Sequence, residues 1–264
     1  MTLRRLDAEL VRRGLAATPE EAQLAVDAGR VTVAGITATK VATMVGGDAP
    51  LEIVGTERRH VSRGGAKLAA ALDRFEVDPR DRDCLDAGAS TGGFTDRLLE
   101  RGAARVAAVD VGYGQLAWRL RSDPRVVVLE RTNVRSLTPS SLPFTPGLVV
   151  ADLSFASLRG VVGVLAAVAS DDAEYILLVK LQFEARREDV GPGGVVRDPA
   201  TWRAAIEEVV RAAVAAGLGA RAVMASPLPG PAGNVEFPLF LRGSDPVGDL
   251  DIDPAIREAQ ELVG

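Results

Sequence analysis

The chain has 264 residues, of which 47% are hydrophobic and 25% charged, as expected for a globular protein with one large domain or a medium domain and a small appendage. A single cysteine, Cys84, excludes internal disulfide bonds and multi-cysteine zinc clusters, and a single histidine, His60, disfavours a histidine-based metal site or a Ser-His-Asp triad, so we expect no metal. The charged first residues and the lack of a long apolar stretch predict a cytoplasmic protein without a secretory signal or a membrane span.

The net charge of -5 is concentrated at the carboxyl end of the chain. Residues 244–264 contain six acidic side chains and one arginine, Arg257, so this segment has a charge of 1 - 6 = -5 and the rest of the chain is neutral overall. The segment is predicted to be a mobile acidic tail. Any surface that attracts nucleic acid must therefore be a local basic patch.

Residues 1–57 predict a small α+β domain. Apolar residues at helical spacing indicate a first helix over residues 3–11. Thr18 followed by Pro19 is typical of the start of a second helix, because threonine caps the N-terminus and proline fits the first helical position. Short β-prone segments complete this domain, and the polar residues 58–63 predict a linker.

Residues 64–243 alternate strand patterns with helix patterns, which predicts a Rossmann-like α/β fold with a mostly parallel sheet covered by helices on both faces. No helix pattern separates the last two strands, so they are expected to pair antiparallel at one edge. The expected strands are residues 83–86, 105–110, 125–129, 148–152, 175–180, 220–225 and 235–241. The expected helices are residues 66–75, 93–101, 115–121, 157–169 and 201–216.

A glycine-rich turn, Asp86-Ala-Gly-Ala-Ser-Thr-Gly-Gly-Phe94, follows the first expected strand of this sheet. Glycines let the backbone approach a ligand, and a helix N-terminus offers free N–H groups to an anionic group. The spacing departs from G-x-G-x-x-G, so we favour S-adenosylmethionine over NAD, with a simple tight turn as the alternative. The residues expected to contact this cofactor are Asp86, Gly88, Ser90, Thr91, Gly92, Gly93, Phe94, Asp110, Asn133, Val134 and Asp152.

Two lysines and two carboxylates, Lys67, Asp152, Lys180 and Glu236, stand at the ends of expected strands or at the start of a helix. For each one alone, a solvated surface charge is the simpler interpretation. Together they suit a reaction in which a ribose hydroxyl, a poor nucleophile, must lose a proton, because neighbouring charges can favour the neutral and basic form of a lysine. We therefore expect the four side chains to meet in space.

Several segments, in order, resemble the TlyA family: Val61-Ser-Arg-Gly-Gly-Ala-Lys67-Leu68, the glycine-rich turn, Asp152-Leu-Ser-Phe155, Leu178-Val-Lys180-Leu-Gln-Phe-Glu184 and Asn234-Val-Glu236. The resemblance covers residues 1 to about 242. It implies an RNA-binding domain of the ribosomal-protein S-four type joined to an FtsJ-like methyltransferase domain. It also implies 2'-O-methylation of cytidine in ribosomal RNA of the large subunit and, in many actinobacterial members, of the small one, by a catalytic set that matches Lys67, Asp152, Lys180 and Glu236.

Where many such RNA-binding domains have Ser-Arg at the start of the second helix, this chain has Thr18-Pro19, so one phosphate contact is expected to be missing. The candidates for RNA contacts are Arg4, Arg12, Arg13, Arg30, Lys40, Arg58, Arg59, Arg63, Arg186 and Arg187, with solvated surface side chains as the alternative. The expected partner is ribosomal RNA or a ribosomal subunit, and no membrane. A non-enzymatic ribosome-assembly factor and a haemolysin, a label also attached to the family, remain alternative functions.

Overall fold

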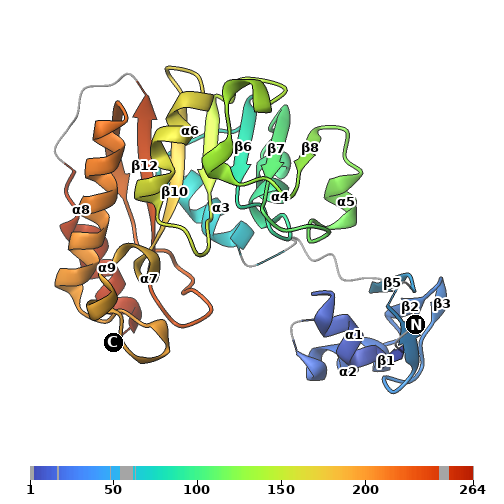
Figure 1. Ribbon diagram of the computed structural model, residues 1–264. Helices are drawn as coiled ribbons and strands as arrows, with labels where there is room; N and C mark the ends of the chain where they lie inside the picture. Colours follow the sequence, from blue (N-terminus) through green and yellow to red (C-terminus); the bar gives the residue numbers. More distant parts are fainter. Residues whose placement is uncertain are drawn as a thin grey trace. The chain divides into compact units, whose positions relative to one another are not determined.

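The computed structural model describes residues 3–16, 18–47, 49–53, 62, 64–243 and 250–263. The chain divides into two compact units, Met1–Arg59 and His60–Gly264 (Figure 1). The expected linker residues 58–63, apart from Ser62, lie outside the described residues.

The first unit contains two helices and short strands. Its elements are β1 (Leu3–Arg5), α1 (Leu6–Arg12), α2 (Pro19–Asp27), β2 (Val31–Val33), β3 (Ile36–Thr37), β4 (Met44–Gly46) and β5 (Leu51–Ile53). β1 pairs with β4, and β2 pairs with β3 and β5. The expected first helix is shorter than its apolar spacing suggested, because residues 3–5 pair with β4 as a strand. Thr18 caps α2 as predicted, since its hydroxyl accepts a hydrogen bond from the Glu21 backbone N–H at 3.2 Å.

The second unit is a seven-stranded sheet in the order β11-β12-β10-β9-β6-β7-β8. Only β12 runs antiparallel to its neighbours, β10 and β11, as the missing helix between the last two strands predicted. The strands are β6 (Asp83–Ala87), β7 (Arg105–Val109), β8 (Val126–Leu129), β9 (Leu148–Ala151), β10 (Glu174–Lys180), β11 (Leu218–Val223) and β12 (Glu236–Gly243).

Helices cover both faces of this sheet (Figure 1). The bounds of the helices are α3 (Gly64–Arg74), α4 (Gly93–Glu100), α5 (Trp118–Arg121), α6 (Val162–Val168), α7 (Leu181–Glu184), α8 (Pro199–Ala215) and α9 (Asp253–Val263). Short 3-10 turns lie at Val134–Ser136, Pro139–Ser141, Leu158–Gly160, Arg187–Asp189 and Pro192–Gly194. The helix expected over residues 157–169 is thus divided into a 3-10 turn and α6.

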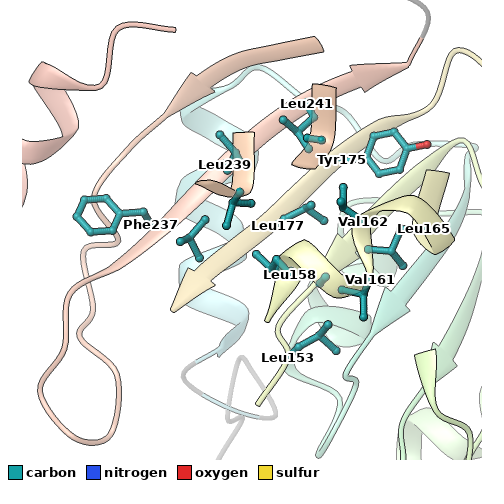
Figure 2. Close-up of a cluster of buried hydrophobic side chains, with 14 of the residues drawn as sticks. Leu153, Leu158, Val161, Val162, Leu165, Tyr175, Leu177, Phe237, Leu239 and Leu241 are labelled. Atoms are coloured by element: carbon teal, nitrogen blue, oxygen red, sulfur yellow. The ribbon is translucent and has the colours of Figure 1, made fainter. Parts of the chain in front are cut away.

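Side chains alternate along the strands between two apolar cores. On β10, Leu177 contributes to the core beneath α6, α8 and α9, whereas Ile176 and Leu178 contribute to the core beneath α3 and α4. Figure 2 shows the first of these cores, where Leu158, Leu165 and other side chains meet the strands. Since the central strands are buried on both faces, the polar residues that remain at their carboxyl ends mark the site.

The acidic tail is not mobile over its whole length, contrary to our expectation. Residues 253–263 form α9, which buries Ala255, Ile256 and Ala259 in the core beneath α8. Asp253 pairs with Arg203, and Glu258 pairs with Arg74 at 2.9 Å. The acidic side chains lie on the outer face of an amphipathic helix, so net charge was a misleading guide to order. Residues 244–249 of the expected tail lie outside the described residues.

No helix in the described part of the chain is both long enough and apolar enough to span a membrane.

Candidate active site

The site lies where the carboxyl ends of β9 and β10 meet the start of β12. Asp152 follows β9, Lys180 ends β10, and Glu236 begins β12. Because β12 runs antiparallel to β10, its first residue lies beside the last residue of β10, and Lys180 and Glu236 are direct cross-strand partners. Ligands bind at this edge of open α/β sheets.

Two ion pairs form in this place. The Lys180 ammonium lies 2.6 Å from Asp152 Oδ1, and the Lys67 ammonium lies 2.5 Å from Glu236 Oε2. The side chains of Lys67 and Glu236 are 9% and 1% exposed, so the second pair is largely shielded from water. The four residues singled out from the sequence therefore come together as two neighbouring ion pairs, although Lys67 lies far from the others in the chain.

The loop after Asp152 provides residues that the sequence analysis did not assign to the site. The hydroxyl of Ser154 accepts a hydrogen bond from Lys180 Nζ at 3.1 Å. The next residue, Phe155, has a positive φ of 62° and is 93% exposed, and its ring centroid lies 5.6 Å from that of Phe183. A non-glycine residue with this backbone conformation is uncommon, and such residues cluster at active sites.

Two buried polar residues hold the surroundings of the site in place. Glu184 accepts hydrogen bonds from the Ser157 hydroxyl and the Leu158 N–H, each at 2.6 Å, and burial raises its pKa. Asn234 accepts a hydrogen bond from the Val196 N–H at 2.8 Å. Both residues lie in segments that carry the family resemblance, but the sequence did not indicate that their side chains are buried.

The glycine-rich turn forms a cradle at the ends of β6 and β7. Gly88 has a φ of 90°, and a Cβ atom there would lie 2.6 Å from the backbone oxygen of Asp152. Asp110 accepts hydrogen bonds from the N–H groups of Ser90 at 2.8 Å and Gly112 at 2.6 Å. A small cavity is lined by Ser90, Asp110 and Gln115, among others. The turn thus places a fixed carboxylate beside open space.

Asp86 is completely buried behind this turn. Its Oδ2 atom accepts hydrogen bonds from the Thr95 N–H at 2.8 Å and the Thr95 hydroxyl at 2.6 Å. Its Oδ1 atom is buried and has no hydrogen-bond partner among the described residues. Burial raises the pKa of Asp86 to about 7. Buried polar atoms usually have a hydrogen-bond partner, so this oxygen is a candidate acceptor for a donor from outside the described residues.

Asp86 gives a prediction about pH. The folded protein keeps this proton up to about pH 7, whereas the unfolded chain releases it near pH 4, so the contribution of Asp86 to stability falls as the pH rises between these values. Asp86→Asn has no proton to lose. In denaturant titrations, the variant should gain about 2 to 3 kcal/mol of unfolding free energy relative to the wild type between pH 5 and pH 8. A difference that does not change with pH would contradict the assignment.

Other residues expected to contact a cofactor differ in their accessibility. Gly92 and Gly93 lie at the start of α4, and Thr91 is exposed beside them. The side chains of Phe94 and Val134 are buried in the apolar cores. Asn133 is exposed, and its side chain accepts a hydrogen bond from the Arg135 N–H at 3.0 Å.

The expected RNA contacts divide into several groups. Arg13 is not free to bind phosphate as expected, because it donates to Glu9 and to the carbonyl oxygens of Gly46, Gly47 and Ala49. Arg12 pairs with Glu9 at 2.5 Å but stays half-exposed. The exposed or partly exposed remainder comprises Arg4, Arg30, Lys40, Arg186 and Arg187. Arg58, Arg59 and Arg63 lie outside the described residues.

Glu9 was missed by the sequence analysis. It is fully buried, and the guanidinium groups of Arg12 and Arg13 lower its pKa to about 2. This ion pair network explains why Arg13 has a structural role. Among the described residues, no three histidine, cysteine, aspartate or glutamate side chains are grouped so that they could hold a metal ion.

Comparison with known protein families finds two domains, in the order that the sequence analysis expected. Residues 60–242 match the FtsJ-like methyltransferase family, and residues 4–50 match the S4 domain. The FtsJ-like match contains all four residues of the two ion pairs.

Relatives are similar over nearly the whole chain. The 16S/23S rRNA (cytidine-2'-O)-methyltransferase TlyA of Mycobacterium tuberculosis is 55% identical over 90% of this chain and 89% of its own length. Hemolysin A of Brachyspira hyodysenteriae is 34% identical over 88% of this chain and 97% of its own. A solved structure titled "Putative hemolysin from Streptococcus thermophilus" covers 100% of this chain and 98% of its own, with a TM-score of 0.76 and 36% identity. The chain therefore belongs to the TlyA family and carries an S4 domain followed by an FtsJ-like methyltransferase domain.

Proposed function

We propose that this protein transfers a methyl group from S-adenosylmethionine to the 2'-hydroxyl of a cytidine in ribosomal RNA. Two neighbouring lysine–carboxylate pairs at the carboxyl ends of the sheet strands carry the proposal. Support also comes from relatives with this activity in their names, such as the 16S/23S enzyme of Mycobacterium tuberculosis. The large-subunit RNA is the first candidate substrate and the small-subunit RNA the second, and either places the reaction in the cytoplasm.

The chain's own residues fit the cofactor. Gly88 leaves room where a side chain would collide with the backbone, and Asp110 presents a carboxylate that can accept from the ribose hydroxyls. The unpartnered oxygen of Asp86 can accept from the amino group of the methionine part. When bound, S-adenosylmethionine supplies an electrophilic methyl group on a sulfonium centre. An NAD-type site is disfavoured by the glycine spacing.

Lys180 is proposed as the general base. Its Nζ atom accepts the proton of the 2'-hydroxyl as the oxygen forms its new bond to carbon, and Asp152 stabilises the ammonium group that results. Lys67 places a second positive charge near Lys180 and is held there by Glu236. Positioning of the reacting groups gives the largest part of such a rate increase, about 7 to 11 kcal/mol in well-oriented systems. The exposed ring of Phe155 offers a stacking face to an unpaired base beside this site.

The direct test is methyl transfer from labelled S-adenosylmethionine to ribosomal subunits isolated from cells that lack this protein. Nuclease digestion and mass spectrometry should then identify 2'-O-methylcytidine in large-subunit RNA. Binding to subunits without label transfer would instead support a non-enzymatic assembly factor. Label on a base rather than on a ribose would contradict the proposed chemistry.

The S4 domain gives a second prediction. Arg4 and Lys40 are exposed and bind RNA phosphates in our proposal, so Arg4→Ala/Lys40→Ala should weaken subunit binding about tenfold and reduce the slope of log K against log salt by about one to two. Arg80→Ala/Arg211→Ala, which removes two exposed positive charges outside the proposed contacts, is the matched control. Filter binding between about 50 and 200 mM salt measures both. Equal losses in the two double variants would argue for a general charge effect instead.

A further inference from the structure

The ammonium group of Lys180 has a second polar neighbour besides Asp152. Nζ lies 2.6 Å from Asp152 Oδ1 and donates a hydrogen bond to Ser154 Oγ at 3.1 Å. Both neighbours belong to the same short segment after β9, and both offer oxygen atoms that can accept. The mechanism above uses the carboxylate but gives the hydroxyl no role.

A lysine that acts as a base must be neutral, and a neutral amine has two N–H bonds and one lone pair. Rotation about the bond between Cε and Nζ decides where that lone pair points. Ser154 Oγ accepts one N–H, and the second N–H is drawn toward Asp152 Oδ1, which lies within ion-pair distance and has no other hydrogen-bond partner among the described residues. The lone pair then points in the third direction, away from Asp152 and Ser154, so a hydroxyl that gives its proton to Lys180 must approach from that side.

We infer that Ser154 is a positioning residue that, together with Asp152, aims the lone pair of Lys180 at the 2'-hydroxyl of the substrate. The inference rests on the proposed function and refines its first step. The proton then leaves the 2'-oxygen and forms the third N–H bond of Lys180. Ser154 continues to accept its hydrogen bond from Lys180 during this step.

The loop that carries Ser154 is held at both ends. Before it, the Asp152 N–H donates to the carbonyl oxygen of Ala87 at 3.0 Å. After it, Glu184 accepts from the Ser157 hydroxyl and the Leu158 N–H. Glu184 lies at the end of α7, which begins directly after Lys180. The segment with Lys180 and the segment with its acceptor are therefore tied together, and the hydroxyl stays beside the amine without a bond to the substrate.

The first test compares the full-length wild type with Ser154→Ala, Ser154→Thr and the matched control Ser140→Ala, which removes an exposed serine hydroxyl outside the site. Single-turnover methyl transfer to undermethylated large ribosomal subunits is measured from pH 6 to pH 10. The plateau rate of Ser154→Ala should fall about 10- to 100-fold, with subunit and cofactor affinities changed less than twofold. The threonine variant, which keeps a hydroxyl, should recover to within about threefold of the wild type. An unchanged plateau in the alanine variant, or a loss of affinity that accounts for the lower rate, would overturn the inference.

A second test does not depend on activity. In lysine-selective 15N spectra, assigned with Lys180→Arg, the side-chain N–H groups of Lys180 should exchange with water faster in Ser154→Ala than in the wild type or in Ser154→Thr. Equal exchange rates of the Lys180 N–H groups in all three proteins would show that Ser154 does not hold the amine. This outcome can be read even if the protein has no activity on RNA. A wild type that transfers no methyl group but shows the expected exchange pattern would refute the proposed function and leave the Ser154 contact supported.

Discussion

Lys180→Ala should lower the single-turnover rate of methyl transfer by about 10²- to 10⁴-fold, the usual contribution of a general base. The variant removes the amine that we propose as the acceptor of the 2'-hydroxyl proton but leaves the S4 domain and the glycine-rich turn untouched. Subunit affinity and cofactor affinity should therefore stay within about twofold of the wild type. Rapid-quench measurement at saturating protein separates the chemical step from binding.

Lys180→Arg is the informative companion to this change. The guanidinium group keeps a positive charge beside Asp152 but does not give up a proton at accessible pH, so the variant should be as inactive as the alanine variant. Arginine that restored substantial activity would assign Lys180 a purely electrostatic role. Thermal unfolding of both variants should be measured beside the rates, because Lys180→Ala leaves the buried Oδ1 atom of Asp152 without its ion-pair partner and Lys180→Arg keeps a positive charge there.

Glu236→Ala should reduce both stability and activity strongly. It leaves the ammonium group of Lys67 buried without its partner, and the loss of one partner from a buried ion pair destabilises proteins by about 3 to 5 kcal/mol. Methyl transfer should fall at the same time, because Lys67 is no longer held beside Lys180. Denaturant titration and single-turnover kinetics measure the two effects separately.

The double variant Lys67→Met/Glu236→Met separates stability from chemistry. Replacement of a buried ion pair by apolar residues of similar size is often neutral or stabilising, so the double variant should be more stable than Glu236→Ala. It should remain inactive, because Lys67 and Glu236 are both missing from the site. A double variant with normal methyl transfer would show that this pair only stabilises the fold.

Much of the second unit could be predicted from the sequence because its strands are buried on both faces. Continuous apolar segments such as residues 175–179 are typical of core strands, and a charge at their carboxyl ends, such as Lys180, is then conspicuous. The meeting of Asp152 with Lys180 was also expected, since the carboxyl ends of neighbouring strands converge at one edge of the sheet. Lys67 lies on α3, so this argument does not extend to its pairing with Glu236.

The features that the sequence analysis missed depend on tertiary neighbours. From the sequence, Glu9 is expected to be a surface charge on a helix. The structure shows that it is buried against Arg12 and Arg13. The helix over residues 253–263 was hidden by its acidic outer face, although its apolar residues have helical spacing. The conformation of Phe155 follows from how the loop is anchored, which no local pattern records.

The one-to-one pairing of Lys180 with Glu236 has a consequence for how the enzyme can diversify. Because neighbouring side chains along a strand point to opposite faces, a slip of β12 by a single position would turn Glu236 away from Lys67. The preceding connection, residues 224–235, contains Asn234, which is hydrogen-bonded to Val196 and Gly194, so a change in its length keeps the site only if Asn234 and the register of β12 both stay in place. The register of β12 is therefore a stricter constraint on this edge of the sheet than the length of the connection that precedes it.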